Sequence, residues 1–468
     1  MSILSKMRQQ ESLDDYVDAD QRLVKSMSAK DLIALGIGAV IGTGIFILPG
    51  TVAATKSGPA IILSFIIAAI VCGLAAMCYA EFSSALPIAG SAYSYGNVIY
   101  GQFIGWLLGW ALVLEYMLSV AAVSTGWAGY FNALLAGFNI HMPKALSGAF
   151  DPAHGTYINL VAVLIVLAVA WLLSGGMKTS TKVQNIMVVV KIAIILIFVV
   201  VGLFYVKPAN WHPFFPYKGG VLAGASAVFF AFLGFDVVAA SAAEVKNPKR
   251  NMPIGIIGTL IIASILYVAV SVVLTGIVSY KELNVADPVA FALQRVGQNW
   301  GAALVSLGAL AGMFTMMLAM IYSSSRLVYS IGRDGLLPKK LGTVDKATGT
   351  PRASLTVVTI IIAVMGGLIP LDQLTSLVNI GTLIAFTFVS FGVLPLRKRQ
   401  DIDHDLGFKV PWYPVLPILS GVACMVLLFR LPGETWVASA IWFSFGILIY
   451  FTYGIRHSKL LKKTGHRA

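Results

Sequence analysis

The stretch Leu35–Phe46 reads LGIGAVIGTGIF, and its pattern determines the fold that we expect for the chain. It is apolar, yet it contains four glycines within nine residues, and each glycine weakens a helix by about 1 kcal/mol relative to alanine in water. One interpretation is close helix packing, because Gly38 and Gly42 form a small-residue face. The other is a helix that breaks at Gly42–Gly44 and exposes backbone amide groups, which attract an anionic group.

The composition of the whole chain is that of a membrane protein. The 468 residues are 58% hydrophobic and 11% charged, with a mean hydropathy of +0.85. A soluble domain has about 25% charged residues, so these few charges cannot cover a soluble protein of this length. The three cysteines, Cys72, Cys78 and Cys424, fall in apolar runs, and we expect packed thiols rather than disulfides.

Apolar runs of about 20 residues recur along the chain and predict twelve transmembrane helices. None of them alternates like a strand, so we expect an all-α membrane bundle and not a barrel. The predicted spans are 32–54, 60–86, 103–136, 157–174, 185–206, 221–243, 254–279, 300–331, 353–369, 374–396, 412–431 and 435–455.

The basic residues are distributed unevenly between the predicted loops. If the N-terminus lies in the cytoplasm, the cytoplasmic segments hold 25 of the 33 Lys and Arg residues and the opposite segments hold 7, with Lys191 inside a span. Basic residues collect in the cytoplasmic loops of membrane proteins. The sequence therefore predicts a multi-pass protein of the inner (plasma) membrane with both termini in the cytoplasm. This topology explains the net charge of +13 without a nucleic acid partner.

A second interruption is predicted in the sixth span, where Ala231–Asp236 places a glycine and an acid inside an apolar run. Interrupted helices at corresponding positions in two halves indicate an inverted-repeat transporter with its site at the middle of the membrane. The expected divisions are a cytoplasmic segment 1–30, a first repeat 31–206 with spans 1 to 5, a second repeat 207–396 with spans 6 to 10, spans 11 and 12 in 397–455, and a cytoplasmic tail 456–468.

The two interruptions would offer complementary groups to a small solute. Amide groups freed in the first would receive a carboxylate, and carbonyl groups freed in the second would receive an ammonium group. A zwitterionic amino acid carries both. The sequence contains no metal-ligand spacing, nucleophile elbow or phosphate loop, so we expect neither an enzyme with catalytic residues nor a metal or cofactor.

Ionisable residues inside the predicted spans need an explanation, because charge is costly in lipid. Lys191 lies about 9 Å inside its span, so it either extends back to the interface or is a buried lysine that gains and loses a proton during transport. Glu115 is a candidate counter-ion or relay for Lys191, with a structural hydrogen bond as the alternative. We expect Asp236 to satisfy amide groups near the second interruption, and Glu81 either to be solvated or to act in a gate.

Four segments together resemble the amino acid/polyamine/organocation superfamily. They are Gly36–Phe46 in the first span, Tyr79–Tyr95 between the second and third, Glu244–Pro253 after the sixth and Arg333–Pro338 after the eighth. The resemblance covers essentially the whole chain, and the branch that it resembles is the bacterial cationic amino acid transporter family.

The resemblance implies a LeuT-type fold with a 5+5 inverted repeat, broken helices 1 and 6, and alternating access. It implies that backbone groups at the two breaks bind the carboxylate and ammonium groups of the substrate, that Phe230 is an aromatic gate, and that Lys191 replaces a sodium ion in proton-coupled members. The implied substrate-binding residues are Val40, Ile41, Gly42, Thr43, Gly44, Phe230, Ala231, Leu233 and Ile321. The resemblance implies Lys191 for proton coupling, and we add Glu115 as a candidate from its position inside a span.

The expected pocket for the substrate side chain is apolar, since it includes Phe230, Phe235, Met320 and Ile321. It offers no carboxylate to a guanidinium group, which favours small or medium neutral amino acids over arginine. We therefore expect a secondary transporter that imports amino acids with protons across the lipid bilayer. An amino acid exchanger and a transporter of a small non-amino-acid metabolite remain alternatives. The sequence says nothing about a small membrane subunit.

Overall fold

The computed structural model describes residues 7, 9–10, 25, 27–88, 90–174, 181–345, 350–399, 402 and 407–459, with the backbone alone for 181–185 and 243. Within these residues every regular element is a helix, and only isolated β-bridges occur besides. The all-α prediction is therefore confirmed for this part of the chain. Most of the predicted cytoplasmic segment 1–30 and of the tail 456–468 lies outside the described residues, as does Ala89 of the Tyr79–Tyr95 motif.

Helices occupy each of the twelve predicted ranges, and those of the first and sixth ranges are in pieces. Two short helices, α7 (Ala92–Ile99) and α14 (Pro288–Arg295), were not predicted, because a search for membrane-length runs misses them. The continuous helices are α6 (Ile61–Ala85), α8 (Gln102–Ala136), α9 (Leu160–Ser174), α10 (Thr181–Leu203), α13 (Pro248–Ile277), α15 (Asn299–Arg333), α16 (Arg352–Leu368), α17 (Leu371–Leu396), α18 (Val415–Leu428) and α19 (Gly433–Ile449), which leads through a π-helix to α20 (Ile455–His457).

The helices have the length and surface of membrane-spanning segments. By length and composition, eight helical stretches of the described residues can cross a membrane, and α9, α16 and α18 are apolar but shorter. Large apolar side chains are exposed on the outside of the bundle, for example Trp171 at 74% and Ile441 at 68%. Water would not tolerate an apolar surface of this extent, whereas lipid matches it.

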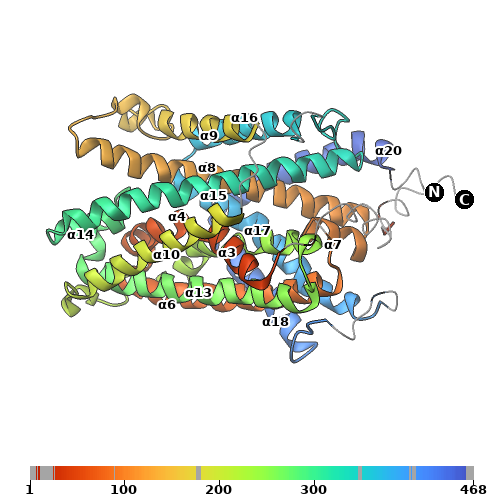
Figure 1. Ribbon diagram of the computed structural model, residues 1–468, viewed down its shortest axis with the longest axis horizontal. Helices are drawn as coiled ribbons and strands as arrows, with labels where there is room; N and C mark the ends of the chain where they lie inside the picture. Colours follow the sequence, from red (N-terminus) through yellow and green to blue (C-terminus); the bar gives the residue numbers. More distant parts are fainter. Residues whose placement is uncertain are drawn as a thin grey trace, which may run out of the picture.

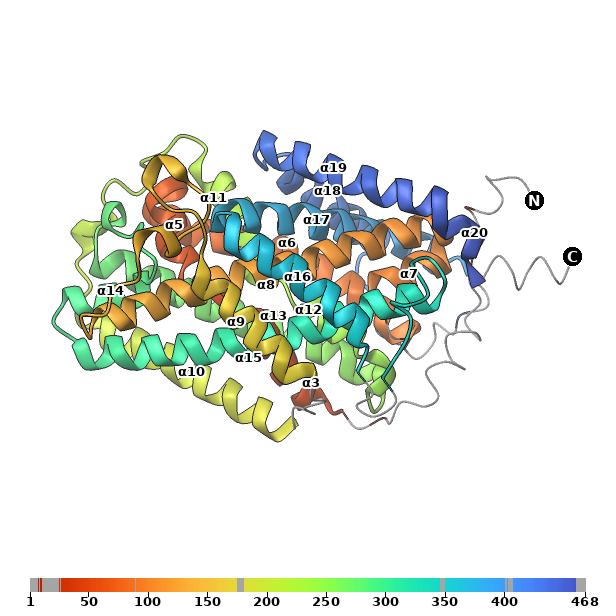
Figure 2. The ribbon, with the colours of Figure 1, turned by 90° about the horizontal axis from the view of Figure 1, so that it is seen from above.

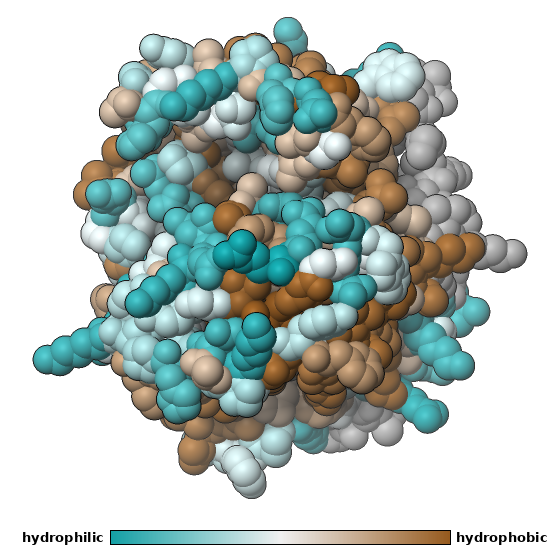
Figure 3. Space-filling view, turned by 90° about the vertical axis from the view of Figure 1, so that its left-hand side faces the viewer, coloured by the Kyte–Doolittle hydropathy of each residue, from teal (hydrophilic) through white to brown (hydrophobic). Residues whose placement is uncertain are grey.

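The helices run roughly along one axis (Figures 1 and 2). The long helices α8 and α15 pack against each other through the middle of the bundle, with α9 against α16 on one side and α6 against α13 on the other. α20 lies at one end of the bundle, called here the α20 end, and α14 lies at the opposite end, called the α14 end. Figure 3 views the α14 end, where hydrophilic residues gather around hydrophobic ones, as expected for a surface that meets water.

The first predicted helix is interrupted near its middle. α3 (Ala29–Val40) begins at a capping box between Ser28 and Asp31 and ends where Ile41 is extended, with ψ of 99°. α4 (Thr43–Phe46) and α5 (Leu48–Val52) follow. The interruption thus lies at Ile41 and Gly42, slightly before the predicted position, because Thr43 and Gly44 already belong to the next helix.

The sixth predicted helix is interrupted as well. α11 (Gly220–Val228) continues as a 3₁₀-helix over Phe229–Phe232, and α12 (Phe235–Ala240) begins after Gly234. Gly234 has φ of 115°, a conformation that favours glycine. A Cβ on Gly234 would lie 2.9 Å from the carbonyl carbon of Ala39, so the α3 backbone passes directly beside this residue.

The two interruptions lie against each other in the middle of the bundle. A Cβ on Gly44 would lie 2.7 Å from the Cα atom of Ala231, so the two main chains are in contact there. Just before α3, the backbone of Met27 also pairs with residues 244–246 through hydrogen bonds of 3.1 and 2.9 Å. The segment before α3 and the segment after α12 are therefore joined to each other.

Replacing Gly234 with alanine should destabilise the protein, because the residue combines a positive φ with a backbone neighbour in contact. We expect Gly234→Ala to cost about 1–3 kcal/mol and to lower the melting temperature of the purified protein in detergent. Gly73→Ala is the matched control, since a Cβ on Gly73 inside α6 meets no atom within 4 Å. It should leave the melting temperature unchanged or raise it. Equal melting temperatures for the two variants would contradict the constraint at Gly234.

Asp287, just before α14 and outside the membrane-spanning helices, should make stability fall as pH rises. Burial raises the pKa of its carboxyl group to about 6. The folded chain therefore holds this proton more tightly than the unfolded chain, whose Asp pKa is about 3.9, and the stability due to the proton is lost between these values. Asp287→Asn should reduce the loss of thermal stability between about pH 4 and pH 6.

Asp151 provides the control for this pH dependence. A hydrogen bond from His154 lowers the pKa of the Asp151 carboxyl group, so its contribution has the opposite sign and is lost as pH falls. Asp151→Asn should therefore not flatten the loss of stability with rising pH. An identical pH profile for Asp287→Asn and the parent protein would contradict the role of Asp287.

Candidate functional site

The interruption of α3 frees carbonyl groups that a continuous helix would satisfy, and Lys191 of α10 provides donors for two of them. Its Nζ donates to Gly38 O and Ile41 O, both at 3.1 Å. The side chain is 1% exposed, so Lys191 does not extend back to the interface. Of the two interpretations of this residue, the structure therefore supports the buried lysine.

Tyr267 of α13 connects the two interruptions. Its buried hydroxyl lies 3.0 Å from Val40 O and 2.6 Å from Ala231 O. A hydroxyl carries one proton, so it fully satisfies one of these carbonyls at a time and leaves the other available to a second donor. Tyr267 was not among the predicted site residues, because a single tyrosine in an apolar run has no motif that distinguishes it from a packed core residue.

The start of α4 offers donors next to these acceptors. Among the described residues, the backbone amides of Gly42, Thr43 and Gly44 have no backbone acceptor. The Thr43 side chain is fully buried, and its Oγ1 has no partner there either. Buried donors without acceptors are rare in proteins, so this cluster can accommodate a bound group that accepts hydrogen bonds.

Apolar side chains surround the two interruptions. Phe230, Leu233 and Ile321 are at most 2% exposed. A Cβ on Gly42 would lie 2.2 Å from the Sδ atom of Met316, so a methionine of α15 covers the first interruption. The expected residues of the two interruptions thus lie together in a buried region, whereas Ile321 of α15 is equally buried but its place beside them stays a prediction.

The structure does not pair Glu115 with Lys191. Glu115 of α8 is fully buried and has electrostatic interactions with Asp236 and Tyr79. The Thr382 side chain of α17 also lies near its carboxyl group, although no hydrogen bond of good geometry joins either carboxyl oxygen to a described residue. Asp236 accepts a 2.7 Å hydrogen bond from Tyr116 through Oδ2, whereas its Oδ1 has no hydrogen-bond partner among the described residues, so the expected role in satisfying backbone amides stays a prediction. The direct counter-ion role of Glu115 is therefore corrected: its electrostatic neighbour is an acid, not the lysine.

Glu81 is not solvated, so one of its two expected roles is wrong. Its side chain is 2% exposed and forms an ion pair with Arg397, in which Arg397 Nε lies 2.6 Å from Glu81 Oε1. The sequence could not reveal this partner, because the two residues lie 316 positions apart.

Comparisons with known proteins show the family of this chain. A family model described as amino acid permease matches residues 27–453. The methylthioribose transporter of Bacillus subtilis (strain 168) is 48% identical over 463 residues, which cover 99% of this chain and 100% of that protein.

Two further relatives are branched-chain amino acid permeases named BcaP. The one from Bacillus subtilis (strain 168) is 45% identical over 456 residues, which cover 96% of this chain and 98% of the relative. The one from Lactococcus lactis subsp. cremoris (strain MG1363) is 41% identical over 455 residues, which cover 95% and 97%. The chain is a multi-pass membrane permease rather than an enzyme, and it belongs to the amino acid permease family of the amino acid/polyamine/organocation superfamily.

Proposed function

We propose that this permease imports amino acids by alternating access, with the substrate held between the two interrupted helices. The observation that carries the proposal is the contact between the interruptions at Gly44 and Ala231. At this contact, the start of α4 has backbone amides without a backbone acceptor among the described residues. Next to them lie two carbonyls, Val40 O and Ala231 O, that share the single hydroxyl proton of Tyr267. Such a site suits a molecule that carries both a negatively charged hydrogen-bond acceptor and a positively charged hydrogen-bond donor.

The fold that would serve this mechanism is a LeuT-type bundle of twelve transmembrane helices. The first repeat would contain α3–α5, α6, α8, α9 and α10, and the second α11–α12, α13, α15, α16 and α17, so that each repeat begins with its interrupted helix. The distribution of Lys and Arg favours a cytoplasmic position for both termini in a bacterial plasma membrane. The α20 end would then face the cytoplasm.

A zwitterion would bind in one orientation. The amides of Gly42, Thr43 and Gly44 would donate to its carboxylate, in the positive field at the start of a helix. Its ammonium group would donate to the carbonyls of Val40 and Ala231 in place of Tyr267, with those of Phe230 and Leu233 nearby. Phe230 would close over the substrate as a gate.

The buried apolar wall favours neutral amino acids with aliphatic side chains. Phe230, Leu233 and Ile321 offer no carboxylate to a cationic side chain. Two relatives are named as branched-chain amino acid permeases, and this chain is 45% and 41% identical to them. A second candidate substrate is methylthioribose, because the relative named for its transport is 48% identical over the full length. This sugar thioether has neither the carboxylate nor the ammonium group.

A ligand screen of the purified protein distinguishes the two substrates. We expect leucine, isoleucine or valine to raise the melting temperature, because a ligand at 100 times its Kd stabilises the folded state by about 2.7 kcal/mol. The amide and carboxylic acid analogues that lack one charge should lose the shift, since each leaves one set of backbone groups unpaired. If methylthioribose raises the melting temperature and no amino acid does, the amino acid proposal is contradicted and the second candidate is supported.

Proton coupling would act through Lys191. The charged ammonium group donates to Gly38 O and Ile41 O and so holds the first interruption in its present form. Loss of the proton would weaken both hydrogen bonds and let the end of α3 move. Glu115, close to Asp236 of α12, would serve as a second proton acceptor near the other interruption.

Replacing Lys191 should uncouple uptake from the pH gradient. In proteoliposomes the parent protein should take up the ligand from the screen faster when the outside is acidic, whereas Lys191→Ala should lose this acceleration and keep part of its binding. Lys144→Ala is the control, because this lysine is exposed in the loop between α8 and α9. If uptake by the parent protein does not depend on the pH gradient but requires preloaded internal substrate, proton coupling is contradicted and an exchanger is indicated.

A further inference from the structure

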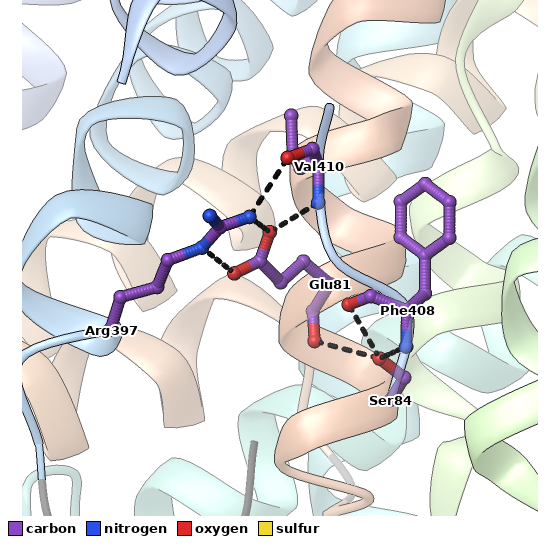
Figure 4. A network of polar contacts seen from close by, with 5 residues as sticks. All are labelled: Glu81, Ser84, Arg397, Phe408 and Val410. Atoms are coloured by element: carbon purple, nitrogen blue, oxygen red, sulfur yellow. Dashed lines mark hydrogen bonds and ion pairs between the residues drawn. The ribbon is translucent and has the colours of Figure 1, made fainter. Parts of the chain in front are cut away.

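An ion-pair network, in which the Glu81 side chain is 2% and the Arg397 side chain 20% exposed, ties three segments together near the α20 end (Figure 4). The Glu81 carboxylate of α6 accepts two N–H groups of Arg397, at 2.6 and 2.8 Å, and the backbone N–H of Val410 at 2.6 Å. Arg397, just after α17, also donates to Val410 O at 2.9 Å. Ser84 accepts from the backbone N–H of Phe408 at 3.2 Å, so the non-helical segment before α18 is held against the end of α6.

Each charge in this network has partners, and this makes it rigid. The guanidinium and carboxylate groups form two parallel hydrogen bonds, the strongest geometry for such a pair. The Arg397 Cζ atom also lies 4.3 Å from the centre of the Tyr413 ring. Glu81 is 2% exposed, and loss of one partner would leave a buried charge without compensation.

The network lies across the boundary that must open if the site is to reach the α20 end. α6 packs on one side against α11 and α13, which adjoin the interruptions, and on the other side directly against α17 and α18, so the ion pair joins α6 to the helices that it would have to leave. Ring contacts also cross this boundary. The ring centre of Phe386 in α17 lies 5.2 Å from that of Tyr79 and 4.9 Å from that of Phe235. Apolar rings can separate without leaving a polar group unpaired. The ion pair cannot separate in this way, because the Glu81 carboxylate would lose its partner, unless water reaches both charges.

We propose that the Glu81–Arg397 ion pair, with the backbone of Val410, is a latch that keeps the α20 end closed and that must open in each transport cycle. This inference rests on the alternating access proposed above, and it assigns a role to residues outside the substrate site. When the latch opens, water replaces the partners of both charges, and α6 separates from α17 and from the segment before α18. The interior side chains along α6 are then exposed to small reagents.

A native cysteine reports on this separation. The Cys78 thiol is buried on α6, one turn before Glu81, and lies beside the hydroxyls of Ser390 in α17 and Ser420 in α18. Cys72 is equally buried on α6 but lies further from the ion pair. Two single-cysteine proteins isolate these reporters: Cys72→Ala with Cys424→Ala retains Cys78, and Cys78→Ala with Cys424→Ala retains Cys72.

The test removes both charges of the latch and measures alkylation by a small maleimide in detergent. Glu81→Gln with Arg397→Gln avoids an unpaired buried charge, and it should raise the Cys78 alkylation rate by at least about tenfold while the Cys72 rate stays unchanged. The matched control is Glu282→Gln with Arg295→Gln, which removes an exposed ion pair of 3.1 Å near α14. It should change neither rate.

Two results with the double variant would overturn the latch. One is an unchanged Cys78 rate in a double variant that melts like the parent. The other is an equal rise at Cys72 and Cys78, which would mean general loosening rather than opening of one end. If the double variant does not fold, Arg397→Lys decides: it keeps the charge but loses the two parallel hydrogen bonds, so the Cys78 rate should rise less than tenfold but measurably. No rise in that variant would also overturn the proposal.

The labelling needs no substrate, so its outcome is separate from that of the proposed function. A selective rise at Cys78 together with failure of all tested amino acids to bind would leave the latch in place and remove the substrate proposal. Amino acid uptake together with an unchanged Cys78 alkylation rate in the double variant would support the substrate proposal and remove the latch.

Discussion

The structure depends on one constraint: backbone polar groups that a helix gives up inside an apolar bundle must find other partners. In lipid no water replaces a lost helical hydrogen bond, so irregular backbone is tolerated only where protein groups or a cavity satisfy it. The chain breaks two helices at the same depth, at Ile41–Gly42 and at Leu233–Gly234. Lys191 and Tyr267 reach in from neighbouring helices to satisfy part of the exposed backbone.

The incomplete satisfaction of this backbone is the basis of the binding site that we propose. Lys191 gives separate donors to two carbonyls, whereas Tyr267 has one proton for two acceptors, and the amides at the start of α4 have no backbone acceptor in the part of the chain that the structure describes. A folded core would normally remove such deficits, because each one reduces stability. A transporter can retain them, since a solute that completes the hydrogen bonds stabilises the state that holds it, and its departure restores the deficit. Weak internal satisfaction therefore allows both binding and release.

The sequence predicts much of this because hydropathy and glycine placement act locally. Runs of apolar residues indicated the helices, and Gly42, Gly44 and Gly234 indicated where two of them break. The partners of the exposed backbone could not be predicted, because they come from helices far away in the chain. Tyr267 is one of many aromatic residues in apolar runs, and nothing local shows that its hydroxyl reaches Val40 O. The pairing of Glu115 with Lys191 failed for the same reason, since helix rotation decides which acid faces which base.

The position of charge along the bundle follows from access to water. In the middle of the bundle, Lys191 forms hydrogen bonds to neutral backbone carbonyls. If Lys191 moves, it therefore breaks hydrogen bonds to carbonyls and does not have to separate an ion pair. Glu81 and Arg397 lie at the end of α6 and just after α17, where water can enter as soon as the helices part. An ion pair is hard to break in lipid but can be hydrated at a membrane surface. A polar latch can therefore be tight when closed and still open, provided that it lies at the end of the bundle, whereas the middle of the bundle must rely on apolar contacts and backbone groups.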